Sequence, residues 1–93
     1  MMPSPLRIGQ IGYGHWGTNL ARAASRTPGC ALIAIADLDQ ANRLRAAADH
    51  RDTAAIADPA ELLAWKGIDA VSIATPAGTH PALVSQALAA GKH

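Results

Sequence analysis

The sequence of 93 residues predicts an α/β fold in which helices cover both faces of a parallel sheet. Short apolar runs alternate with helix-like segments along the chain, as they do in successive βαβ units. The connections are short, and a glycine-rich turn follows the first apolar run directly. Right-handed crossovers then predict a Rossmann-type, doubly wound sheet of four strands in the order 3-2-1-4, incomplete at its C-terminal side.

The first third of the chain predicts a strand, a helix and a second strand. Residues 1–5 are expected to be a flexible end, and residues 6–11 a buried strand. A helix is expected from residue 15 to about residue 25, because the Thr-Pro-Gly sequence at residues 27–29 is a stop signal. The uninterrupted apolar run 30–36 suits a parallel strand that is covered on both faces.

The middle of the chain predicts a helix, a short strand and a shorter helix. Asp39 is expected to cap a helix that runs to about residue 50. We expect this helix to bury an apolar stripe of Ala41, Leu44 and Ala48. Residues 53–57 are a strand candidate, and Asp58-Pro59-Ala60-Glu61 is typical of a helix start.

The remaining third predicts one more strand and one more helix. Residues 68–74 form the expected strand, residues 75–78 a loop, and residues 79–90 a helix with Gly91 as its C-cap. The loop would then lie beside the glycine-rich turn, at the carboxyl edge of the sheet where such folds bind ligands.

The glycine-rich turn has the pattern Gly-x-Gly-x-x-Gly, and each glycine has a physical role. Gly12 allows the tight turn off the strand. Gly14 allows the backbone to approach a pyrophosphate, and Gly17 allows the helix to pack closely on the strand. The helix N-terminus would offer N–H groups and a partial positive charge to the phosphates.

Asp37 ends the second strand, at the position where a dinucleotide-binding fold places a carboxylate for the adenine ribose. The alternative role is to cap the next helix, for which Asp39 is better placed. A carboxylate repels a 2′-phosphate, and Leu38 rather than an arginine follows it, so the sequence favours NAD over NADP. Leu38 is expected to line the adenine site rather than the core.

Five further residues are candidates for contact with the cofactor. His15 and Trp16 are the variable residues of the turn, and they either cover the ligand or pack on a neighbouring loop. Thr75 and Pro76 border the nicotinamide half in this prediction. His80 either reaches the nicotinamide or is a surface residue of its helix. FAD and a methyl-donor nucleotide are rival ligands, but they explain the 75–78 loop less well.

Composition narrows the classes of partner and chemistry. The net charge of +1 without a basic run gives no indication of nucleic acid binding, and no apolar run approaches the ~20 residues of a membrane span. Cys30 is the only cysteine, which fits a reducing cytoplasm. The histidines lack metal-ligand spacing, so we expect no metal site, and no nucleophile with a paired base is evident.

These motifs together resemble the Gfo/Idh/MocA family of NAD(P)-dependent oxidoreductases. The resemblance covers nearly the whole chain from Leu6 onward, and it rests on the glycine turn, the Ala36-Asp37 strand end, the run 71–76, the Thr79-His80 pair and the segment 89–93. It implies hydride transfer between the nicotinamide and a sugar-type alcohol. The Tyr13, Trp16 and Asn19 pattern is similar to the branch that acts on nucleotide sugars.

The resemblance also implies that parts of the family's machinery lie outside this sequence. Family members carry a substrate domain and a Glu-Lys-Pro motif whose lysine is catalytic; Lys92 does not match that lysine. We therefore expect a partial NAD(P)-binding domain at residues 6–93, without a catalytic residue or substrate domain. The last strand would be an open edge, which predicts homo-oligomers. The alternative is a stand-alone nucleotide-binding module or a non-catalytic fragment.

Overall fold

The structure, a computed structural model, describes residues 4–74 and residue 91. Its strands are β1 (Leu6–Ile11), β2 (Cys30–Ala36), β3 (Ala54–Ile56) and β4 (Ala70–Ile73). They form one parallel sheet in the order β3-β2-β1-β4, which confirms the predicted topology. The helix expected at residues 79–90 lies outside the described residues.

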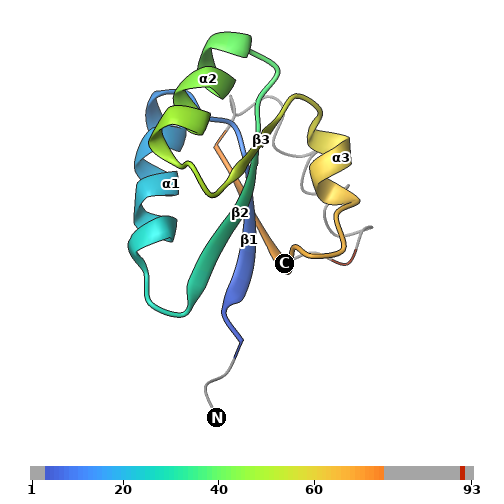
Figure 1. Ribbon diagram of the computed structural model, residues 1–93. Coiled ribbons are helices and arrows are strands. Elements are labelled where there is room, and N and C mark those ends of the chain that lie inside the picture. Colours follow the sequence, from blue (N-terminus) through green and yellow to red (C-terminus); the bar gives the residue numbers. More distant parts are fainter. Residues whose placement is uncertain (1–3, 75–90, 92–93) are drawn as a thin grey trace.

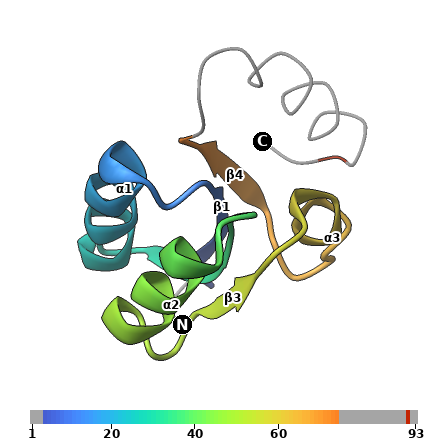
Figure 2. The same ribbon diagram turned by 90° about the horizontal axis from the view of Figure 1, so that it is seen from above.

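Three helices connect these strands: α1 (His15–Arg26), α2 (Gln40–Asp49) and α3 (Pro59–Leu63). Figures 1 and 2 show α1 and α2 on one face of the sheet and α3 on the other. This is the arrangement that right-handed crossovers produce when the chain first moves outward from β1 to β3 and then returns to β4.

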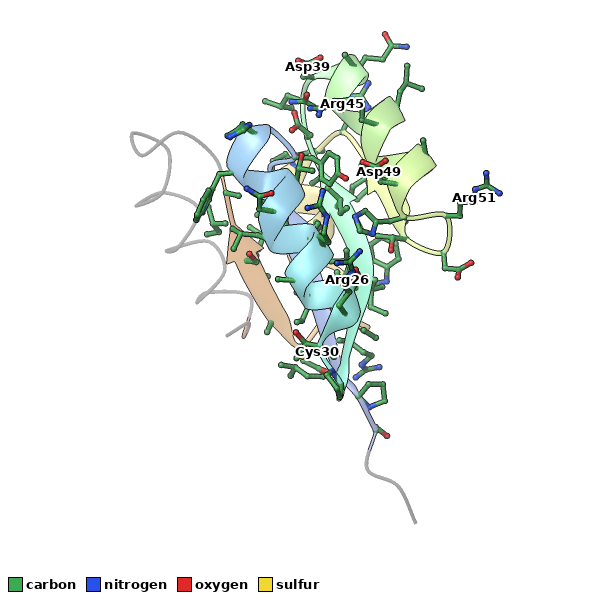
Figure 3. All side chains as sticks on the ribbon, turned by 90° about the vertical axis from the view of Figure 1, so that its left-hand side faces the viewer. Arg26, Cys30, Asp39, Arg45, Asp49 and Arg51 are labelled. Carbon is green, nitrogen blue, oxygen red and sulfur yellow. The ribbon has the colours of Figure 1, made fainter. Side chains whose placement is uncertain are left out.

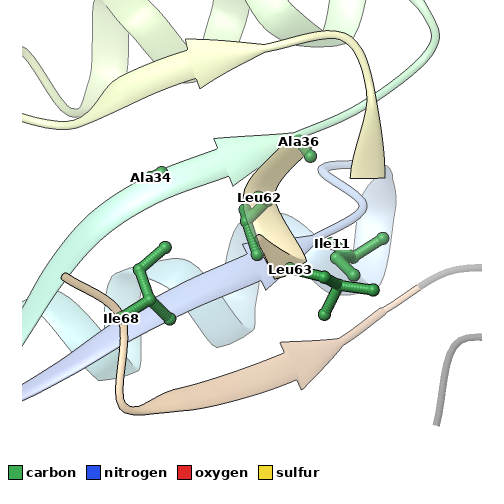
Figure 4. Close-up of a cluster of buried hydrophobic side chains, with 6 residues drawn as sticks. All are labelled: Ile11, Ala34, Ala36, Leu62, Leu63 and Ile68. Carbon is green, nitrogen blue, oxygen red and sulfur yellow. The ribbon is translucent and has the colours of Figure 1, made fainter. Parts of the chain in front are cut away.

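Each face of the sheet has its own apolar core. On the α3 face the buried cluster consists of Ile11, Ala34, Ala36, Leu62, Leu63 and Ile68 (Figure 4). On the α1 and α2 face it consists of Tyr13, Ala21, Leu32, Ile35 and Ala46. The strand β2 contributes buried residues to both cores, as its uninterrupted apolar sequence predicts. The strand β1 contributes Ile11 to the first core and the partly buried Ile8 to the second.

The helix caps agree with the sequence. The carboxylate of Asp39 accepts the N–H of Ala41 at 2.9 Å, and that of Asp58 accepts the N–H of Ala60 at 2.9 Å. Pro59 occupies the first turn of α3, where its missing N–H costs no helical hydrogen bond. Both predicted starts are confirmed.

The apolar stripe predicted for α2 is wrong. Ala41, Leu44 and Ala48 are exposed, Leu44 to 65%, and Ala46 is the buried residue of this helix. A polar contact accounts for the different buried face: Asn42, one turn before Ala46, donates a hydrogen bond to Asp37, which directly follows β2. An apolar pattern read along one helix does not include a hydrogen bond to the loop before it.

Candidate functional site

The carboxyl ends of β1 and β2 bring the glycine-rich turn and Asp37 together. The N–H of Gly12 donates to the carbonyl of Ala36 at 2.7 Å, which extends the strand pairing into the turn. Toward β3, the N–H of Asp37 donates to the carbonyl of Ile56 at 2.9 Å. The two segments are adjacent because neighbouring parallel strands end at the same edge of a sheet.

The three glycines of the turn have distinct surroundings. Gly12 has a φ of 100°, a backbone conformation that strongly favours glycine. A Cβ on Gly17 would lie 2.4 Å from the carbonyl oxygen of Gly12, so α1 packs on the turn with no room for a side chain. A Cβ on Gly14 would meet no atom within 4 Å. Packing within the chain therefore accounts for Gly17, whereas Gly14 faces open space.

The N-terminus of α1 differs from those of α2 and α3. Gly14 occupies its N-cap position without a side-chain hydrogen bond, and the first turn contains no acidic residue. Side chains of Asp39 and Asp58 cap the other two helices. The first N–H groups of α1 thus lack a side-chain acceptor at the point where the chain leaves the glycine turn, which suits an anionic ligand.

Three donors hold the carboxylate of Asp37. Its Oδ2 accepts the backbone N–H of Tyr13 at 2.8 Å and the side-chain amide of Asn42 at 3.0 Å. Its Oδ1 accepts the N–H of Asp39 at 2.8 Å. The glycine turn and α2 therefore fix this carboxylate between them, and Oδ1 keeps the greater capacity to accept another hydrogen bond.

Arg45 completes a ring of hydrogen bonds that includes Tyr13, Asp37 and Asn42. Its Nη2 donates to the Asn42 side-chain oxygen at 2.6 Å and to the Tyr13 carbonyl at 3.0 Å. The guanidinium also lies 5.7 Å from the centre of the Tyr13 ring. The four residues Tyr13, Asp37, Asn42 and Arg45 thus form a closed circuit, which holds the orientation of Asp37 before any ligand arrives.

A second arginine of α2 reaches the same loop. Arg43 donates from Nη1 to the carbonyls of Asp37 at 2.9 Å and Leu38 at 3.0 Å. Sequence reasoning considered only the residue after Asp37 and missed this arginine, which approaches from five or six positions further along the chain. The guanidinium is engaged with backbone oxygens, and it does not contact the Asp37 carboxylate through any hydrogen bond in the described part of the chain.

Gln10 is a structural support of the turn that sequence reasoning also missed. It is completely buried, and its Nε2 donates to the carbonyls of Gly12 at 2.9 Å and Gly17 at 2.7 Å. One side chain therefore ties the start of the turn to the first residues of α1. The available signal was an uncharged polar residue near the end of a largely apolar strand, two positions before the first glycine of the motif.

Tyr13 belongs to the glycine turn, but its side chain is buried rather than exposed. It is completely buried, and its hydroxyl donates to Asp49 Oδ2 at 2.5 Å. The His50 ring contacts it edge-on with 5.9 Å between the ring centres. Burial, helped by the hydrogen bond and the charge of Asp49, raises the pKa of the Tyr13 phenol to about 12.

The other predicted site residues fall into two groups. His15, Trp16 and Leu38 lie at the surface beside the turn and the end of β2, and Trp16 and Leu38 are exposed to 65% and 77%. Leu38 is therefore not a core residue. Thr75, Pro76 and His80 lie outside the described residues.

The described residues contain neither a cluster of metal ligands nor a membrane-spanning helix. No group of three or more His, Cys, Asp or Glu side chains there is arranged to hold a metal ion. No helix in this part of the chain is long and apolar enough to cross a membrane. A cytoplasmic location and the lack of a metal both stay predictions.

The sequence profile of an oxidoreductase family with an NAD-binding Rossmann fold, named Gfo/Idh/MocA, matches residues 6–93. The chain belongs to this family. Its parallel sheet, in the order β3-β2-β1-β4, agrees with the NAD-binding Rossmann fold of that family. The match confirms the resemblance drawn from the motifs.

Several Gfo/Idh/MocA relatives carry names of inositol dehydrogenases. Inositol 2-dehydrogenase 1 of Saccharopolyspora erythraea is 35% identical over 89 residues, which are 94% of this chain and 26% of the relative. The inositol 2-dehydrogenase of Acidothermus cellulolyticus is 38% identical over 88 residues, with the same coverage. The chain therefore spans about a quarter of the length of these relatives.

Solved structures of the family agree with the fold. Apo scyllo-inositol dehydrogenase from Lactobacillus casei is 28% identical and superposes with a TM-score of 0.90, over 100% of this chain and 28% of that one. The same enzyme with bound NAD(H) and scyllo-inositol has a TM-score of 0.83, over 97% of this chain and 27% of that one. The region in common includes all the elements described above.

Proposed function

We propose that the chain binds NAD in preference to NADP, with Asp37 accepting a hydrogen bond from the adenine ribose. The observation that carries this proposal is the carboxylate of Asp37, fixed beside the glycine turn by Tyr13 and Asn42. A ribose hydroxyl can donate to Oδ1, which has one protein donor. A 2′-phosphate would instead be repelled by the negative charge of Asp37. The hydrogen bonds of Asp37 keep this carboxylate from turning away from the phosphate.

The glycine turn would hold the pyrophosphate in this arrangement. Open space at Gly14 leaves room for the phosphate groups, and the uncapped start of α1 offers N–H donors to them. Leu38 and Trp16 present exposed apolar side chains, which we propose contact the adenine and the rest of the cofactor. His15, Thr75, Pro76 and His80 are proposed as further cofactor contacts.

The complete protein, on this proposal, oxidises a sugar-type alcohol. The family description and the names of the inositol dehydrogenases support a CH–OH substrate. NAD supplies the hydride chemistry when bound, and the residues described here bind and orient it. Residues beyond this sequence would supply the substrate domain and the catalytic lysine. We also propose that the 93-residue chain self-associates through the edge of β4 that pairs with no strand among the described residues.

A calorimetric titration with NAD and NADP tests the cofactor preference. We expect NAD to bind more tightly than NADP, and Asp37→Ala to reduce this difference by about tenfold or more, since one charge-assisted hydrogen bond and one repulsion are lost. Asp52→Ala, an exposed carboxylate in the turn after α2, is the matched control and should keep the preference. Equal affinities of the unchanged chain for both nucleotides would contradict the proposal.

A further inference from the structure

A polar hollow lies between α1 and α2, and it extends from the Tyr13 ring toward the end of α1. Its volume is about 350 Å³, and it is lined by Tyr13, Thr18, Arg22, Ser25, Arg26, Asp49 and His50. Figure 3 looks onto this face, with Arg26 on α1 and Asp49 on α2. Because α1 runs away from the glycine turn, Arg26 at its end is about 16 Å along the helix axis from His15 at its start.

Two cationic side chains at this hollow lack a partner in the described part of the chain. Arg22 and Arg26 are one helical turn apart and therefore lie on the same side of α1. Neither guanidinium makes a hydrogen bond or an ion pair within residues 4–74, where Arg7 and Asp69 form the ion pair. The charge of Arg22 nevertheless acts on the Tyr13 phenol, whose pKa it lowers slightly against the stronger effect of burial.

The two aliphatic hydroxyls of the hollow have their protons already engaged. The hydroxyls of Thr18 and Ser25 donate to the carbonyls of Gly14 and Arg22, each at 2.9 Å. Asp49 accepts the Tyr13 hydroxyl through Oδ2, which leaves Oδ1 as an acceptor. The hollow thus presents guanidinium donors from α1 together with hydroxyl and carboxylate acceptors, a combination that suits an oxyanion carried by a hydroxylated molecule.

We propose that the hollow between α1 and α2 binds a phosphate-type oxyanion through Arg22 and Arg26. Guanidinium groups match phosphate oxygens with paired N–H donors, and two of them on adjacent turns can hold one phosphate group. The volume leaves space for a small molecule attached to that group. Nucleic acid is a poorer match, because the chain carries a net charge of only +1 without a basic run.

Calorimetry with inorganic phosphate, at constant ionic strength in chloride, tests this site on the 93-residue chain. We expect saturable binding with a Kd of about 1 mM. Arg22→Gln and Arg26→Gln should each weaken it about tenfold. Arg51→Gln is the matched control, since Arg51 is an exposed arginine just beyond α2 that does not line the hollow, and it should leave the affinity unchanged. Amide NMR shifts should be confined to the facing sides of α1 and α2.

Two comparisons identify the source of the anion and separate this site from the cofactor site. Inorganic phosphate and glycerol 2-phosphate distinguish a free anion from an anionic group on a hydroxylated molecule. Saturating NAD should leave phosphate binding intact. The proposal is overturned if binding does not saturate, if it survives both arginine substitutions, if Arg51→Gln weakens it equally, or if NAD displaces the phosphate.

Discussion

Tyr13 joins three parts of the molecule through one residue. Its backbone N–H holds Asp37, its carbonyl accepts Arg45, and its hydroxyl reaches Asp49 near the end of α2. An aromatic residue between two glycines of the glycine-rich turn is therefore a core residue here. Its phenol also reports on the packing between α1 and α2, because it is the only tyrosine in the chain.

The ionisation of Tyr13 gives a pH prediction at this scale. The phenol should titrate near pH 12 in the folded chain and near 10 when unfolded, because ionisation places a charge in a buried position and breaks the bond to Asp49. The stabilisation is complete below pH 10 and is lost as the pH rises toward 12, since the unfolded chain releases the proton first. Ultraviolet absorbance of tyrosinate measures the titration.

Two variants complete that test. Asp49→Asn should lower the midpoint, because the charge and the strong acceptor are both removed. The free energy of unfolding should fall above pH 10 partly because Tyr13 ionises, and Tyr13→Phe should remove that part of the fall. The fall that remains in Tyr13→Phe then reports other groups, such as lysines. A phenol that titrates near 10 in the folded chain would contradict both the burial of the Tyr13 side chain and its contact with Asp49.

At the scale of elements, the glycine turn sets the distance between α1 and β1. A Cβ on Gly17 would meet the turn itself, whereas a Cβ on Gly14 would meet no atom within 4 Å. Gly17→Ala should therefore destabilise the fold by about 1–3 kcal/mol, because the new Cβ would press on the backbone oxygen of Gly12. Denaturant unfolding measures this change.

Gly14→Ala is the matched substitution in the same motif. It should leave the free energy of unfolding within about 0.5 kcal/mol of the unchanged chain, because its Cβ enters open space. It should nevertheless weaken NAD binding, because the proposed pyrophosphate occupies that space. Equal destabilisation by both alanines would show that the two glycines have the same structural role.

Local sequence patterns predicted the strands, the strand order and the two aspartate caps, because each depends on residues close together in the chain. They did not predict the buried face of α2, which depends on Asn42 reaching Asp37. They also missed Gln10, whose importance comes from contacts with both ends of the glycine turn. Side-chain hydrogen bonds to loops and turns, even over two to seven residues, leave no periodic signal in the sequence.

At the scale of the whole molecule, the two edges of the sheet differ in length. β3 forms one edge with three residues, and β4 forms the other with four, paired to β1 along one side. Within the described residues, the second side of β4 pairs with no strand. An apolar edge with free N–H and C=O groups favours pairing with another chain, and a two-fold axis would bring two β4 strands together.

The 93-residue chain should therefore sediment as a concentration-dependent dimer. Pairing through β4 would give its outward N–H groups strand partners, which residues 4–74 do not supply. Hydrogen exchange at Ala70–Ile73 should then slow as the protein concentration rises, because the dimer protects those amides. The amides of Ala54–Ile56 on the opposite edge serve as the internal control, and their exchange should not depend on concentration. A monomer at every concentration, or equal protection of both edges, would rule out pairing specific to β4.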